Sequence, residues 1–159
     1  SHDNLQDTVQ TCLDQSGLPP DALELEITES LLMDNLEQAI ALLHALRALG
    51  IRISLDDFGT GYSSLSYLKK FPIDFLKIDQ TFVRDLIHEA DADAIVRSII
   101  SLAHNMRMQV IAEGVETPAQ RDFLVTQGCD VLQGYLFARP MPVGEFQAQL
   151  QEGTARRGV

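Results

Sequence analysis

Short apolar segments alternate with longer amphipathic segments along this chain, and this alternation limits the possible fold more than any other feature. Apolar patterns predict β-strands at residues 23–28, 51–55, 75–78 and 109–112, and two shorter strands at 131–132 and 136–137. Helical spacing predicts α-helices at residues 4–15, 35–49, 64–70, 91–105, 118–127 and 144–151. Such alternation is typical of α/β proteins with parallel strands.

Local signals mark where the predicted helices begin and end. Gly17 and the pair Pro19-Pro20 close the first helix, and Gly50 follows the second. Thr117 is a predicted N-cap, because Pro118 after it suits the first helical position. We expect residues 153–159 to form a flexible tail.

The composition predicts a soluble globular domain, or part of one. Of the 159 residues 45% are hydrophobic, but no apolar run is long enough to cross a bilayer. Residues 1–10 lack the basic start and the apolar centre of a secretory signal. We therefore expect a cytoplasmic segment without membrane contact, even if other domains attach a longer protein to a membrane.

The net charge of −11 argues against binding to a DNA or RNA polymer, which needs clustered Lys and Arg. It does not exclude a small phosphate ligand. Divalent cations held by carboxylates neutralise a phosphodiester locally while the protein surface stays negative. The alternative is that the acidity serves solubility alone.

Polar side chains recur at the ends of successive predicted strands. They are Glu26, the pair Asp56-Asp57, Lys77, Glu113 and Gln133. In parallel α/β architectures the carboxyl ends of the strands and the loops after them converge on the ligand site. The repeated placement therefore predicts that these residues share one site.

The residue types in this set point to metal-assisted chemistry. Carboxylate oxygens without His or Cys partners favour hard cations such as Mg²⁺ or Mn²⁺. The adjacent Asp56 and Asp57 suit two metals roughly 3.5–4 Å apart, as in displacement at phosphorus. Lys77 is expected to stay protonated and to orient a hydroxide or phosphate oxygen, and Glu113 to act as a ligand or base.

Each of these residues also has a purely structural interpretation. Asp56 and Asp57 could form a turn that caps a following helix. Lys77 could pair with Asp74 or Asp79 alone. Glu113 and Glu116 could be first-turn helix charges, Glu26 could face solvent, and Gln133 by itself carries little information.

Five ordered motifs also resemble those of the EAL-domain family. They are Glu26-Ile27-Thr28-Glu29-Ser30, Asp56-Asp57-Phe58-Gly59-Thr60-Gly61-Tyr62-Ser63-Ser64, Phe75-Leu76-Lys77-Ile78-Asp79, Ala112-Glu113-Gly114-Val115-Glu116 and Gln133-Gly134-Tyr135-Leu136-Phe137-Ala138-Arg139-Pro140. Members of that family are bacterial phosphodiesterases that open the second messenger cyclic di-GMP to linear pGpG on a TIM-like (β/α) barrel. The resemblance predicts a partial EAL domain over residues 1–152.

The resemblance implies a role for each matching residue. Glu26, Asp56 and Asp57 match metal ligands of a two-metal site, with Asp56 bridging. Lys77 matches the lysine that contacts the catalytic water, and Glu113 the acidic residue proposed as base or second-metal partner.

Three further positions match residues around that centre. Glu29 matches the glutamate that anchors the loop after Asp57, which is thought to couple metal binding to dimerisation. Glu116 and Gln133 match positions near the substrate guanine or phosphate.

The chain departs from the family pattern because it has neither the Glu-Ala-Leu strand nor the strand with an asparagine ligand. A complete barrel needs roughly 250 residues, so this chain is expected to supply about six of its strands. The incomplete ligand set predicts a weakly active or inactive piece of a phosphodiesterase. The alternatives are a naturally shortened, non-catalytic module that binds cyclic di-GMP, and an interaction module.

The open strand edge of such an incomplete barrel predicts homodimers or higher oligomers.

Overall fold

The structure is a computed structural model that describes residues 2–28, 36–58 and 68–156. Residues 1, 29–35, 59–67 and 157–159 lie outside this description, as does the side chain of Asp57. Most of the predicted helix at residues 64–70 falls in the second gap.

Five parallel strands form one sheet, in which the order of the strands follows the order of the chain. The strands are β1 (Glu24–Thr28), β2 (Arg52–Phe58), β3 (Phe75–Ile78), β4 (Gln109–Ala112) and β5 (Val131–Leu132). A parallel sheet whose strands are joined by helices confirms the predicted α/β class.

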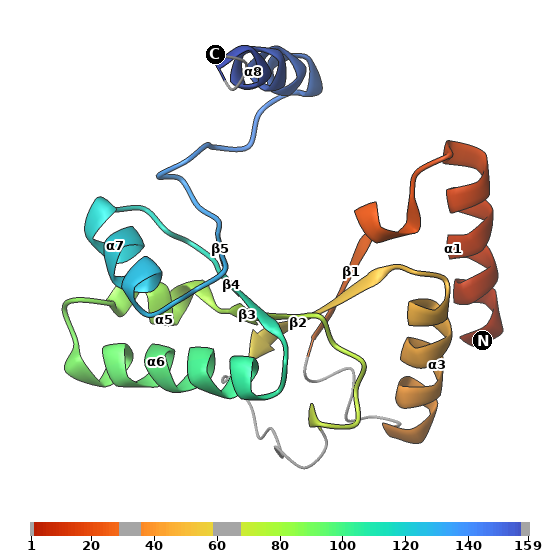
Figure 1. Ribbon diagram of the computed structural model, residues 1–159, viewed down its shortest axis with the longest axis horizontal. Coiled ribbons are helices and arrows are strands. Elements are labelled where there is room, and N and C mark those ends of the chain that lie inside the picture. Colours follow the sequence, from red (N-terminus) through yellow and green to blue (C-terminus); the bar gives the residue numbers. More distant parts are fainter. Residues whose placement is uncertain (1, 29–35, 59–67, 157–159) are drawn as a thin grey trace.

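The helices form two groups and one outlier. They are α1 (His2–Ser16), a 3₁₀ turn η1 (Pro20–Ala22), α3 (Leu36–Ala48), α5 (Gln80–Asp85), α6 (Ala90–Asn105), α7 (Pro118–Thr126) and α8 (Val143–Arg156). The pair α1 and α3 lies beside β1 and β2, and α5, α6 and α7 lie together near β3 to β5 (Figure 1). Helix α8 lies apart, at the end of an extended segment. Among the helices that the structure describes, none is long and apolar enough to span a bilayer.

Two predictions about secondary structure were incomplete or wrong. Leu136 and Phe137 form a turn and not a strand, because the amides of Phe137 and Ala138 both donate to the carbonyl of Gly134. The described residues therefore hold five strands where about six were expected. Helix α5 was not predicted; Asp79 begins it by accepting a hydrogen bond from the amide of Thr81 at 2.8 Å.

The core lies between the central strands and the helices beside them. All four residues of β3 are buried, as expected of a central parallel strand that is covered on both faces. Leu76 and Ile78 on one face belong to the main apolar core, together with Ile53 and Val110 of the neighbouring strands. The other face of β3 carries Lys77 and therefore leaves room for a polar site.

At two places in the sheet, an aspartate that immediately precedes one strand accepts a hydrogen bond from the neighbouring strand. Asp74 precedes β3 and accepts from the amide of Ile53 in β2 at 3.1 Å. Asp130 precedes β5 and accepts from the amide of Val110 in β4 at 2.8 Å. Each carboxylate also contacts a basic residue of a nearby helix end. Asp74 lies 2.8 Å from Arg47 of α3, the helix before β2, and Asp130 lies 2.9 Å from His104 of α6, the helix before β4. The same contact pattern therefore sets the register of both strand pairs.

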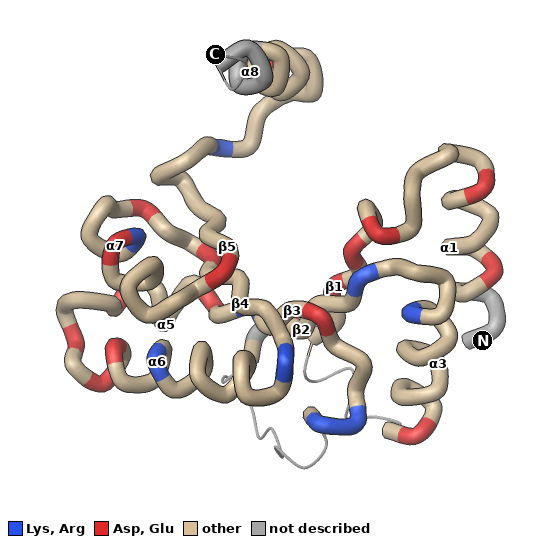
Figure 2. Tube along the Cα trace, viewed as in Figure 1, with Lys and Arg blue, Asp and Glu red and all other residues tan. Residues whose placement is uncertain are grey.

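Charged residues are unevenly distributed over these elements. Asp and Glu occur on most helices, whereas Lys and Arg lie singly or in pairs on separate elements (Figure 2). Among the described residues, Lys and Arg are therefore not gathered along one element, as binding to a phosphate polymer would require.

Candidate active site

Lys77 is the centre of a cluster of carboxylates at the carboxyl end of the sheet. Its side chain is only 5% exposed. The Nζ atom lies 2.6 Å from Oε1 of Glu26, 2.7 Å from Oε1 of Glu113 and 3.9 Å from Oδ2 of Asp56. Three carboxylates from three other segments of the sequence thus meet at one ammonium group.

The strand register explains why these side chains meet. In the sheet Glu26 pairs with Ser54, Thr28 pairs with Asp56, and Lys77 pairs with Ile111. The amide of Glu113 continues the ladder past β4 by donating to the carbonyl of Ile78. Because all strands are parallel, their carboxyl ends lie at one edge, and side chains of one face converge there.

The surroundings of Lys77 keep its side chain charged. Burial by itself lowers the pKa of an ammonium group, but hydrogen bonds to Glu113 and Glu26 and the charges of Glu113 and Asp56 oppose this effect. The net result is a pKa above the ordinary value for lysine. Lys77 is therefore a permanent cation at neutral pH.

The structural interpretations of Lys77 and Glu113 are wrong. Asp74 pairs with Arg47, and Asp79 begins helix α5, so neither takes Lys77 as its partner. Glu113 bonds Lys77 and, like Glu116, precedes helix α7, which begins only at Pro118. The side chain of Glu26 is half exposed to solvent, but its carboxylate also forms an ion pair with the ammonium of Lys77.

The loops after β4 and β5 are held against each other directly beside this cluster. The amide of Val115 donates to the carbonyl of Gln133, and the amide of Leu136 donates back to the carbonyl of Val115, each at 3.0 Å. A Cβ atom at Gly134 would lie 2.2 Å from the carbonyl oxygen of Val115, so only glycine allows this approach. The contact sets the position of Glu113 relative to Gln133.

Glu116 and Gln133 are exposed and lie outside the group of carboxylates that surrounds the ammonium of Lys77. The backbone of Glu116 is held in place, because its amide donates to Oε1 of Gln120 at 2.9 Å. Asp57 and Glu29 also belong to the predicted site, but the side chain of Asp57 and the whole of Glu29 lie outside the described residues.

Gln120 is a positioning residue that the sequence reading missed. Its buried side chain accepts from the amides of Glu116 and Thr117 and donates to the carbonyl of Val83 at 3.0 Å. Thr117 and Gln120 form a capping box at the start of α7. The spacing Thr-x-x-Gln was the signal that could have identified it.

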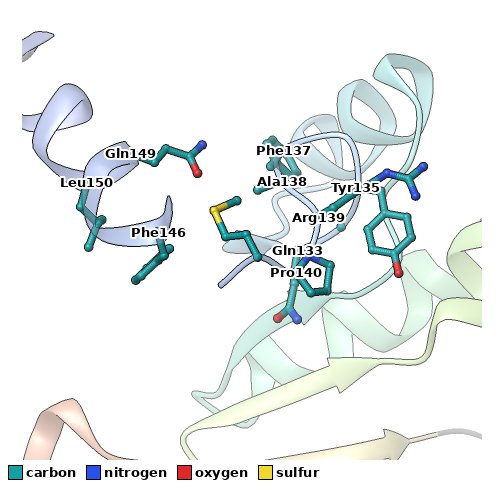
Figure 3. A pocket seen from close by; sticks show the side chains of 11 residues that line it. Gln133, Tyr135, Phe137, Ala138, Arg139, Pro140, Phe146, Gln149 and Leu150 are labelled. Atoms are coloured by element: carbon teal, nitrogen blue, oxygen red, sulfur yellow. The ribbon is translucent and has the colours of Figure 1, made fainter. Parts of the chain in front are cut away.

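A separate hollow of about 950 Å³ lies between the segment after β5 and helix α8. Figure 3 shows Gln133, Pro140 and Arg139 on one side of it and Phe146 and Leu150 on the other. The guanidinium of Arg139 lies over the ring of Tyr135, 4.6 Å from its centroid. Gln133 is the one predicted site residue in its lining, so this hollow is distinct from the carboxylate cluster.

The donor set of the cluster fits a hard divalent cation. Glu26, Asp56 and Glu113 offer only carboxylate oxygens, which Mg²⁺, Mn²⁺ and Ca²⁺ accept readily. Among the described side chains, however, no three acidic, His or Cys groups are gathered in a way that could hold one ion. The carboxylates of Glu26 and Glu113 converge on the ammonium of Lys77 instead.

Comparison with known proteins identifies the family to which the chain belongs. The EAL domain family matches residues 1–140, and the chain therefore belongs to this family. It is 47% identical over 148 residues to the cyclic di-GMP phosphodiesterase NbdA of Pseudomonas aeruginosa, covering 93% of this chain and 19% of that protein.

Two solved structures have the same fold. One is the PaMucR phosphodiesterase in complex with c-di-GMP, with a TM-score of 0.87 and 46% identity over 92% of this chain and 59% of that one. The other is BlrP1 of Klebsiella pneumoniae with manganese and cyclic di-GMP, with a TM-score of 0.76 and 38% identity over 84% of this chain and 35% of that one. The five-stranded sheet is thus a segment of the TIM-like barrel of EAL domains, and the chain spans less than two thirds of each of these relatives.

Proposed function

We propose that the chain is part of a phosphodiesterase domain that hydrolyses cyclic di-GMP to linear pGpG by attack of water on a phosphodiester. The observation that carries the proposal is the buried Lys77 surrounded by Glu26, Asp56 and Glu113 at the carboxyl end of a parallel sheet. Membership of the EAL family and similarity to named cyclic di-GMP phosphodiesterases support the same substrate.

In this proposal Glu26, Asp56 and Asp57 hold Mg²⁺ or Mn²⁺ in a two-metal site. Bound divalent cations supply charge stabilisation at phosphorus and make a bound water more acidic. The similarity to a manganese complex of BlrP1 supports a divalent metal.

Lys77 and Glu113 are the proposed catalytic residues. The ammonium of Lys77, which stays protonated, orients the attacking water or a non-bridging phosphate oxygen. Glu113 accepts a proton from that water or supports the second metal, and its 2.7 Å contact with Lys77 holds its carboxylate at the site.

Substrate contacts are assigned to the two loops that are held together beside the cluster. Glu116 and Gln133 are proposed to contact the guanine or phosphate of cyclic di-GMP. Their relative position is set by the hydrogen bonds between Val115 and the loop after β5. Glu29 is proposed to anchor the loop after Asp57.

The isolated 159-residue chain is proposed to be weakly active or inactive, because it lacks the Glu-Ala-Leu and asparagine motifs that supply further metal ligands. The second candidate function is a non-catalytic module that binds cyclic di-GMP or a protein. The observation that favours it is that the described side chains gather no three acidic, His or Cys groups that could hold one metal ion.

For the isolated chain we propose a cytoplasmic location and self-association into dimers or higher oligomers, without a DNA or RNA polymer as partner. The edge strand β1 is only partly buried, and Val143, Phe146 and Leu150 of α8 expose apolar surface. A second copy of the chain would cover such surfaces.

The test is calorimetric titration of cyclic di-GMP into the chain with Mg²⁺ or with Ca²⁺, with chromatographic assay of the same samples for pGpG. Binding with little or no product is the expected result. Glu113→Gln should remove any product that the chain forms, whereas Glu145→Gln on the remote helix α8 is the control and should change nothing. Absence of binding with both cations would contradict the proposal, and rapid turnover would contradict its statement about the isolated chain.

A further inference from the structure

Lys77 bonds the same carboxylates that are proposed to bind or adjoin the metal ions. Its Nζ atom is within hydrogen-bond distance of Glu26 and Glu113, at 2.6 and 2.7 Å, and lies 3.9 Å from Asp56. A cation that coordinates these oxygen atoms must therefore share them with the ammonium or displace it.

Both the charge and the position of Lys77 oppose a second cation. The side chain is only 5% exposed and its ammonium is held by contacts with Glu26 and Glu113, so a small rotation does not bring the ammonium into solvent. Water screens like charges poorly in such a place. A divalent ion among these carboxylates would experience the repulsion of the ammonium at close range.

The geometry of the carboxylates agrees with such competition. Within the part of the chain that the structure describes, no three acidic groups are gathered around a point that suits a metal. Glu26 and Glu113 come from β1 and from the loop after β4, and both direct an oxygen at Lys77. The ammonium thus occupies the focus of the carboxylate cluster.

We propose that Lys77 sets the affinity of the site for divalent cations by competing for the oxygens of Glu26 and Glu113. This inference rests on the proposed function, in which these carboxylates adjoin the metal site. It assigns Lys77 a role in metal loading in addition to its role in hydrolysis. The two roles respond in opposite directions when the charge is removed: cation binding becomes tighter and hydrolysis is lost.

The first experiment measures Mn²⁺ binding to the 159-residue chain by the electron paramagnetic resonance signal of free Mn²⁺. Lys77→Met removes the charge and keeps most of the side-chain volume, and it should lower the Kd for Mn²⁺ at least tenfold. Lys77→Arg keeps the charge and should bind within about threefold of the unchanged chain. Lys69→Met removes an exposed lysine charge in the same way and is the control, expected within about twofold.

Equal or weaker Mn²⁺ binding by folded Lys77→Met would overturn the proposal, because it would make Lys77 merely a support for the ligands. Absence of Mn²⁺ binding by folded Lys77→Met as well as by the unchanged chain would also overturn the proposal, because removal of the charge would then not open the carboxylates to a cation. The proposed function is tested separately, by the titration with cyclic di-GMP. Thermal melting adds a second readout. Without Lys77 the carboxylates lose their buried partner, so Mn²⁺ should raise the Tm of Lys77→Met more than that of the unchanged chain.

A measurement on the unchanged chain avoids any dependence on whether the variant folds. A buried, hydrogen-bonded ammonium exchanges its protons slowly and gives a side-chain signal in a ¹H–¹⁵N correlation spectrum. That signal should shift or disappear as Mg²⁺ loads the site. A signal that stays unchanged while calorimetry shows Mg²⁺ binding would overturn the proposal.

Discussion

At the scale of single residues, Asp74 shows how one side chain supports the site without belonging to it. Its carboxylate accepts from the amide of the fully buried Ile53 and pairs with Arg47, and its backbone joins β2 to β4. These contacts lie at the start of β3, the strand that carries Lys77. Asp74 therefore helps to set the register in which Lys77 meets its partners.

We expect Asp74→Ala to lower the free energy of unfolding by about 1–3 kcal/mol, because it leaves the buried amide of Ile53 without its acceptor. Arg47→Ala removes only a half-exposed ion pair and should cost about 1 kcal/mol or less. Urea denaturation of both variants measures the difference. Equal losses would mean that the ion pair, and not the hydrogen bond to the strand, is the main contribution.

At the scale of elements, the loops after β4 and β5 behave as one unit. The carbonyl of Val115 accepts from Leu136, its amide donates to Gln133, and Gly134 packs directly on its backbone. Helix α7 begins immediately after the first loop, with a capping box and a proline at its start. The position of Glu113 thus depends on the loop after β5 as well as on its own strand.

We expect Gly134→Ala to destabilise the chain by about 1–3 kcal/mol, because the added Cβ forces the two loops apart. It should also weaken cyclic di-GMP binding, since Glu116 and Gln133 lie in these loops. Gly144→Ala is the matched control: its Cβ would meet nothing within 4 Å, and alanine suits a helix better. Denaturation and calorimetry should show loss for the first variant alone.

At the scale of the whole molecule, apolar surface is left uncovered where α8 lies away from the sheet (Figure 1). Phe146 and Leu150 are about half exposed, and Val143 one turn earlier is 73% exposed. These residues share one face of the helix. The same face borders the hollow formed with the segment after β5 (Figure 3).

In sedimentation velocity we expect the isolated chain to form dimers or larger species at micromolar concentration. Phe146→Glu places a charge on the apolar face of α8 and should shift the distribution toward monomer. Ala148→Glu adds the same charge on the opposite face and is the control. A monomeric chain with cooperative melting would contradict the proposed self-association.

The local sequence was sufficient for most elements. Apolar periodicity predicted all five strands, and Thr117 with Pro118 located the start of α7, because these signals depend on neighbouring residues alone. The predicted strand at Leu136 and Phe137 failed for a non-local reason. The amide of Leu136 donates to the carbonyl of Val115, which belongs to a different loop. The amides of Phe137 and Ala138 donate to the carbonyl of Gly134, so the chain forms a turn at this point.

The sequence by itself determined which residue types stand at the carboxyl ends of the strands, and hence that carboxylates and one lysine were candidates for a common site. Only the tertiary structure decided that Lys77, and not the carboxylates alone, lies at the focus of that site. Glu26 and Glu113 are 51 and 36 positions away from Lys77 in the sequence. Their meeting depends on the register of four parallel strands, which is a property of the packed sheet and not of any local segment.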